Sequence, residues 1–158
     1  MKTINPFLWF DTEAEQAAEL YTSLFEDAEI TDISRYGEGG PGPAGSAMTV
    51  SFALNGLPFV ALNGGREHGF TDAVSMQVHC ETQQEVDRLW EALTDGGEEG
   101  RCGWCKDRFG LSWQVVPTAL GSLLQDPDPG RAQRAMTAML TMSKLDVDAL
   151  RAAAGDAG

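Results

Sequence analysis

Two short runs of the chain carry side chains that could take part in chemistry. In residues 75–80, alternation along an extended strand would point Ser75, Gln77 and His79 to one face. An imidazole exchanges a proton near neutral pH, so His79 could serve as a general acid or base, or anchor a polar ligand. A structural histidine with a hydrogen-bond partner fits the same pattern. His68 lies in a polar loop, where we expect it to be solvated.

Cys102 and Cys105 have the spacing of a redox pair or of half a zinc site. Redox chemistry of this kind needs the first cysteine at a helix N-terminus, where the helix dipole lowers the thiol pKa, but residues 106–110 have the composition of a turn. A zinc site would need more ligands, and strand alternation sends His79 and Cys80 to opposite faces. We therefore expect neither chemistry from this pair.

The elements that must position these residues follow a repeated order. The first half predicts a strand, an amphipathic helix and three more strands, at residues 4–10, 13–25, 28–36, 48–54 and 58–62. Asn55 and Gly56 predict a hairpin between the last two strands, since both residues tolerate positive φ. Residues 37–45 are rich in glycine and proline and predict a loop, without the strand and helix that flank a phosphate-binding loop.

The second half repeats this order. It predicts a strand at 73–80, a helix that begins at Thr82 and ends before Gly96, a weak strand near 100–104 and a strand at 110–116. Two further helices follow, at residues 131–140 and 147–153. A repeated βαβββ unit predicts an α+β fold built from two similar modules.

Composition and charge exclude several classes of partner. The chain has 158 residues, 42% of them hydrophobic, and 11 Lys and Arg against 24 Asp and Glu give a net charge of −13. This charge repels phosphate backbones and anionic lipids, so we expect neither nucleic acid nor a membrane as a partner. The first residues lack the basic and apolar regions of a signal peptide, and three cysteines make no disulfide framework. We therefore expect a cytoplasmic protein.

Several segments, taken in order, resemble one known family. They are Phe7-Leu8-Trp9-Phe10, Ala17-Ala18-Glu19-Leu20-Tyr21, Leu62-Asn63-Gly64-Gly65, Gln84-Glu85-Val86-Asp87, Cys102-Gly103-Trp104, Asp107-Arg108-Phe109-Gly110, Trp113-Gln114-Val115-Val116-Pro117 and the tail from Ala135 to Lys144. Together they are similar to the PhnB-like branch of the vicinal-oxygen-chelate superfamily (glyoxalase, bleomycin resistance, dioxygenase), whose members are often described as 3-demethylubiquinone 3-methyltransferases.

The resemblance implies an architecture as well as a family. Two βαβββ modules would form a curled mixed sheet around a cavity, followed by C-terminal helices, in a single domain over residues 1–158. Module one would cover about 1–65, module two about 72–117 and the helical tail about 118–158. The family also implies a homodimer.

The resemblance further implies positions for metal ligands. In metal-dependent members four ligands project into the cavity, and the matching positions here are Asn5, Ser75, Gln114 and either Ala61 or, if the register shifts, Asn63. Neutral amides and a hydroxyl cannot neutralise a divalent cation. We therefore predict no metal and no cofactor.

The implied cavity is lined by Asn5, Phe7, Trp9, Asn63, Ser75, Gln77, His79 and Gln114. Phe7 and Trp9 could stack on a flat ligand or simply line an apolar space. We favour metal-free binding of a small molecule. The alternatives are a lyase, isomerase or dioxygenase that uses a metal or His79, and an interaction protein whose own side chains fill the cavity. The order of elements argues against methyl transfer, which commonly uses a doubly wound parallel sheet with a glycine-rich turn.

Overall fold

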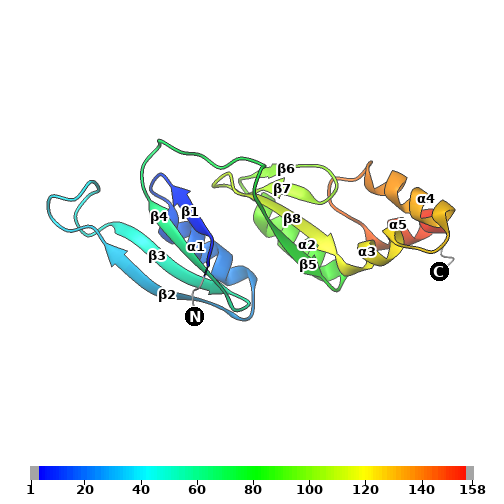
Figure 1. Ribbon diagram of the computed structural model, residues 1–158, viewed down its shortest axis with the longest axis horizontal. Coiled ribbons are helices and arrows are strands. Elements are labelled where there is room, and N and C mark those ends of the chain that lie inside the picture. The colour runs from blue at the N-terminus through cyan, green and yellow to red at the C-terminus, as the bar shows by residue number, and fades with distance from the viewer. Residues whose placement is uncertain (1–3, 156–158) are drawn as a thin grey trace. The chain divides into compact units, whose positions relative to one another are not determined.

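The computed structural model describes residues 4–155, and the chain divides into two compact units, residues 1–70 and 71–158. Each unit carries a four-stranded sheet and a helix packed against it, and the second unit ends in three more helices (Figure 1). The predicted α+β fold with two βαβββ modules is confirmed. The sheets are two four-stranded sheets that do not close, and a single domain with one cavity stays a prediction. Residues 1–3, where we expect no signal peptide, lie outside the described residues.

The first unit consists of β1 (Phe7–Phe10), α1 (Ala14–Leu24), β2 (Ala28–Arg35), β3 (Ala47–Leu54) and β4 (Leu57–Asn63). The strands lie in the order β1-β4-β3-β2, with β1 parallel to β4 and the other pairs antiparallel. Between β3 and β4, Asn55 has φ 48° and Gly56 has φ 79°, the left-handed pair that a type I′ hairpin requires. The predicted hairpin is confirmed.

The two faces of the first sheet differ in burial, as alternation predicts. Leu8 and Phe10 are buried on the face that α1 covers, whereas Phe7 keeps 58% of its surface exposed on the other face. Tyr21 of α1 lies in this core with its ring 6.1 Å from that of Phe52 on β3. Burial of Leu8, Phe10 and Phe52 fixes the register of β1 and β3, because a shift of one residue would turn these side chains to the other face of the sheet.

The second unit consists of β5 (Ser75–Cys80), α2 (Gln83–Thr94), β6 (Glu98–Glu99), β7 (Trp104–Lys106) and β8 (Ser112–Pro117), in the sheet order β5-β8-β7-β6. The start of α2 is a capping box, in which Thr82 accepts from the backbone N–H of Glu85 and Glu85 accepts from that of Thr82. The helix buries its apolar side against the sheet through Val86, Leu89, Trp90 and Leu93.

The strand expected at residues 100–104 is wrong. Cys102 has φ 56° and Gly103 has φ 83°, and the N–H of Trp104 donates to the carbonyl of Arg101 at 3.0 Å. These values describe a type I′ turn between two short strands, so Cys102 takes the position that asparagine has at residue 55. Cysteine carries no turn signal of its own, and the sequence therefore concealed this hairpin.

The chain after β8 forms a helical tail with α3 (Thr118–Leu124), α4 (Pro129–Met139) and α5 (Val147–Ala154). Sequence periodicity predicted α4 and α5 but missed α3, which is short and contains a glycine. The three helices bury a small core of their own, made of Leu120, Leu123, Ala135, Leu145, Leu150 and Ala154.

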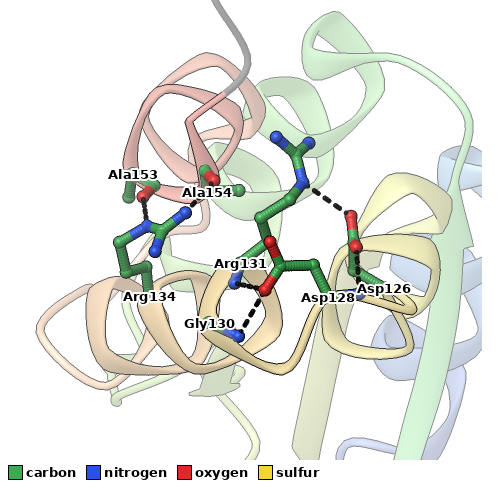
Figure 2. A network of polar contacts seen from close by, with 7 residues as sticks. All are labelled: Asp126, Asp128, Gly130, Arg131, Arg134, Ala153 and Ala154. Carbon is green, nitrogen blue, oxygen red and sulfur yellow. Dashed lines mark hydrogen bonds and ion pairs between the residues drawn. The ribbon is translucent and has the colours of Figure 1, made fainter.

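Two arginines of α4 hold the tail together (Figure 2). Arg134 donates to the carbonyl oxygens of Ala153 and Ala154 at 3.2 and 2.9 Å, which satisfies acceptors at the end of α5. Arg131 donates to Asp126 at 2.9 Å, and this hydrogen bond lowers the pKa of the Asp126 carboxyl. The contacts place positive charge at a helix C-terminus, where the helix dipole favours it.

The tail is attached to the second sheet by backbone hydrogen bonds. The N–H groups of Cys102 and Gly103 donate to the carbonyls of Met142 and Ser143, both at 2.8 Å. Gln83, at the start of α2, adds two side-chain hydrogen bonds. Its Nε2 donates to the carbonyl of Leu145, and its Oε1 accepts from the N–H of Val147, the first residue of α5. No helix in residues 4–155 is long and apolar enough to cross a bilayer.

Candidate functional site

The eight predicted cavity residues divide equally between the two units. In the second unit, β5 lies parallel to β8 with Ser75 beside Ser112, Gln77 beside Gln114 and His79 beside Val116. Cross-strand neighbours share a face, so all six lie on the face away from α2. We call this surface the amide face of the second sheet.

A chain of hydrogen bonds crosses the amide face. The side-chain amide of Gln77 donates to Oε1 of Gln114 at 3.2 Å, and Nε2 of Gln114 donates to the hydroxyl of Ser75 at 2.8 Å. Three of the predicted residues are thus brought into one uncharged network. His79 lies on the same face at the end of β5, where its side chain is exposed.

Charged residues that the sequence did not single out adjoin this network. Ser112 donates to Asp72 at 2.7 Å, and Lys106 forms an ion pair with the same carboxylate at 3.4 Å. The hydrogen bond from Ser112 is the main cause of the lowered pKa of Asp72. Asp72 precedes β5 and Lys106 ends β7, so only the strand pairing reveals that they meet.

A hollow of about 490 Å³ opens beside this charged pair. Trp104 lines it and is paired with Gln114 across the sheet, so an indole ring lies next to the amide network. The other side chains that line the hollow are mostly charged: Asp72, Glu98, Glu99, Arg101 and Lys106. The second unit therefore places an uncharged hydrogen-bonding network beside an aromatic ring and a charged hollow.

The first unit places its predicted residues differently. Phe7 and Trp9 lie on the face away from α1, beside Val60 and Leu62 of β4. Asn5 is half-buried and donates to the neighbouring carbonyl of Pro6 at 3.1 Å.

Asn63 is paired with the buried Phe10, on the side that α1 covers. Its Oδ1 accepts from the N–H of Ala14 at 2.8 Å and its Nδ2 donates to the carbonyl of Ala47 at 3.0 Å. The side chain thereby caps the start of α1 and ties it to β3.

A second hollow, of about 600 Å³, lies where strands of the first sheet end. We call it the strand-end hollow. It is lined by Trp9, Asp11, Thr12, Tyr36, Pro41, Gly42, Pro43, Ser46, Leu62, Asn63, Gly64 and Gly65. Trp9 and Asn63 were predicted as cavity residues, whereas Asp11 and Tyr36 were missed because each lies at the end of a strand, where alternation does not show which turns meet.

The residues at the metal-ligand positions do not fit a divalent cation. Gln114 uses both ends of its amide in hydrogen bonds to Gln77 and Ser75, and Asn63 uses both ends of its amide on backbone groups. These amide groups carry no charge to balance a divalent cation, and their oxygens are already hydrogen-bonded within the protein. Within residues 4–155, no group of three or more His, Cys, Asp or Glu residues is placed to hold a metal.

The cysteines are held in different environments. Burial raises the pKa of the Cys80 thiol to about 11 and that of Cys105 to about 12, so both stay protonated near neutral pH. Cys102 is half-buried in the hairpin turn. The C-x-x-C spacing therefore joins a turn residue to a buried strand residue.

This difference predicts selective alkylation. With iodoacetamide at pH 8, we expect Cys102 to react first and Cys80 and Cys105 to react roughly 100-fold more slowly, because burial suppresses both access and thiolate. Peptide mass spectrometry over time measures the three rates, and labelling in urea provides the control in which all three react. Equal rates in the folded protein, or a Cys102–Cys105 disulfide under mild oxidation, would contradict this interpretation.

Two four-stranded mixed sheets in a repeated βαβββ order define the glyoxalase/bleomycin-resistance fold. The sequence profile of the family described as 3-demethylubiquinone-9 3-methyltransferase matches residues 2–116. The chain therefore belongs to this PhnB-like family of the vicinal-oxygen-chelate superfamily. The match ends just before α3, so the helical tail lies outside it.

Solved structures agree with this assignment. A PhnB protein from Bacillus cereus that carries the same methyltransferase description is 37% identical, covers 74% of this chain and 100% of its own, and has a TM-score of 0.69. Protein PA1353 from Pseudomonas aeruginosa (21% identity, 74% and 98% coverage, TM-score 0.61) shares the fold. So does the fosfomycin resistance protein FosX from Listeria monocytogenes (15%, 71% and 89%, 0.51). A search of curated proteins found no match.

Proposed function

We propose that this protein binds a small, uncharged polar molecule on the amide face of the second sheet without the help of a metal. The observation that carries the proposal is the uncharged hydrogen-bonded network of Gln77, Gln114 and Ser75, two of which, Ser75 and Gln114, stand at positions where the family resemblance implies metal ligands. We also propose a cytoplasmic homodimer, in accord with Phe7, which leaves 58% of its surface exposed on the sheet face away from α1.

The network leaves defined groups for a ligand. The Ser75 hydroxyl accepts from Gln114 and keeps its own proton to donate, while Gln77 keeps its Oε1 as an acceptor. One donor beside one acceptor suits an amide, lactam or urea group. The neighbouring indole of Trp104 offers an apolar wall for the rest of such a molecule.

The sheet topology supports binding over methyl transfer. Each sheet has a single parallel pair, β1 with β4 and β5 with β8. A doubly wound parallel sheet, which adenosylmethionine-dependent enzymes commonly use, has another strand order. We therefore do not extend the methyltransferase description of the family to this chain, and we propose metal-free binding instead.

A panel of small amides, lactams and ureas tests this function by thermal shift and native mass spectrometry in EDTA. For the best member of the panel, Gln114→Leu should weaken binding about tenfold or more, because Ser75 and Gln77 would lose the amide that orients the groups they offer to the ligand. Gln133→Leu, on the exposed side of α4, is the matched control and should bind as the parent does. Binding that requires a divalent metal, or that survives Gln114→Leu unchanged, would refute the proposal.

A further inference from the structure

The strand-end hollow of the first unit is a second binding site, and we infer that it takes a planar organic cation. This inference does not depend on the amide face, because the hollow belongs to another sheet and offers other chemistry. Its volume of about 600 Å³ lies in the range of cavities that hold small organic ligands.

The topology explains why a hollow forms at this place. β1 is parallel to β4, and β2 and β4 both pair antiparallel with β3, so β1, β2 and β4 run in the same direction. Their carboxyl ends meet at one edge of the sheet. The residues there include Asp11 after β1, Tyr36 after β2 and Gly64 after β4. The turns that follow these three strands therefore lie together at this edge and form the walls of the hollow.

The aromatic walls are held in fixed positions. The indole N–H of Trp9 donates to the carbonyl of Gly65 at 2.8 Å, and the Tyr36 hydroxyl donates to the carbonyl of Asn63 at 2.6 Å. A Cβ at residue 64 would collide with the Trp9 ring, so glycine at this position lets the indole lie close to the backbone. Two polar groups are thus satisfied by the protein. The Trp9 ring also meets the His68 ring edge-on, with 4.7 Å between centroids, and the parts of Trp9 and Tyr36 that line the hollow are left to contact a ligand.

The charge of the hollow selects a cation. Among its lining residues Asp11 carries the charge, and Thr12 and Ser46 add hydroxyl groups. Aromatic rings next to a carboxylate attract a cation through both the ring quadrupole and the Coulomb interaction. At the start of α1, Asn63 accepts from the N–H of Ala14 and Glu13 adds a negative charge, and both offset part of the positive end of the helix dipole.

A planar cation already binds Asp11 within the protein. The Arg66 guanidinium contacts Asp11 through Nε at 2.7 Å, yet its side chain is 90% exposed and does not line the hollow. Such exposed pairs are weak, so a ligand can share or displace Arg66. The proposed ligand therefore carries an amidinium or guanidinium group, which pairs with a carboxylate in plane, on a flat apolar body.

Benzamidinium, benzamide and benzoate form a matched set of probes with one ring and three charges. By isothermal titration calorimetry at low ionic strength, we expect saturable binding of benzamidinium at least tenfold tighter than that of benzamide. Asp11→Asn should weaken benzamidinium binding at least tenfold, and Arg66→Ala should strengthen it severalfold by removing the internal competitor. Asp32→Asn, an exposed acid on β2, should leave it unchanged.

The outcomes separate this site from the amide face. Gln114→Leu should leave benzamidinium binding intact even if it abolishes binding of neutral amides. The inference is overturned if Asp11→Asn, shown to be folded by circular dichroism, binds benzamidinium as tightly as the parent, or if benzoate binds as tightly as benzamidinium. Loss of binding in Trp9→Leu with the same melting temperature would add support, and unchanged binding in that variant would count against the hollow.

Discussion

Replacing Asp107 by alanine is expected to destabilise the folded protein by about 3–5 kcal/mol, the cost of leaving several buried donors without their charged acceptor. Asp107 is 2% exposed. Its carboxylate accepts from the N–H groups of Phe109 and Leu111 at 2.9 and 3.1 Å and from the indole N–H of Trp113 at 2.9 Å. One side chain therefore shapes the turn into β8 and fixes the indole behind it.

Urea unfolding followed by tryptophan fluorescence measures this loss. Asp107→Asn is the informative companion, because it keeps one acceptor oxygen while its NH₂ group must face a donor. We expect the free energy of unfolding of Asp107→Asn to lie between those of the parent and of Asp107→Ala. Asp95→Ala, which removes an exposed carboxylate that pairs with Arg108, should cost less than about 1 kcal/mol. Similar losses for Asp95→Ala and Asp107→Ala would show that the buried network contributes little.

The second large effect is expected at Leu145, which is fully buried in the core of the tail. Leu145→Ala should destabilise the protein by about 2–5 kcal/mol, because the truncated side chain loses its burial and leaves a cavity. The side chain also packs next to Gly103 in the hairpin turn. The loss should therefore fall on the contact between tail and sheet.

Hydrogen exchange provides a local measurement of this effect. In Leu145→Ala, we expect the amides of Cys102 and Gly103 to lose protection, because they donate to carbonyls in the segment before α5. Leu140→Ala is the matched control, since Leu140 is 57% exposed and its truncation should change stability little. Unchanged protection in Leu145→Ala would mean that the tail does not depend on this residue.

The sequence predicted the fold further than it predicted the site. Alternation and helical periodicity located β1 and β5 before the helices α1 and α2 and β8 after α2, and grouped Phe7 and Trp9 on one face of the first strand. These patterns indicate which side chains are buried, and they can be recognised within the sequence of a single strand or helix. The sequence did not predict the hairpin at Cys102, because cysteine is not a residue type that favours the left-handed backbone found there.

Contacts across strands were harder to predict. Asp72 and Lys106 meet through pairing of distant strands, and no local pattern announces such a pair. Asn63 was predicted as a cavity residue and lines the strand-end hollow, and its amide also caps α1 and binds the backbone of β3, which the sequence did not reveal. A single sequence shows which residues can form hydrogen bonds, whereas the choice of partner depends on register and on the turn that follows each strand.

The turn at Cys102 and Gly103 has a consequence for how this protein can change. The position demands a left-handed backbone and an N–H that reaches the tail, and neither requirement involves sulfur. Asparagine and glycine meet both requirements with less strain than cysteine. We therefore expect substitutions at residue 102 to be tolerated according to how well the new residue adopts a left-handed turn, and not according to whether it keeps a thiol. A Cys102→Asn substitution would leave Cys80 and Cys105, both buried, as the remaining cysteines. A cysteine introduced elsewhere on the surface could then be labelled selectively with a probe.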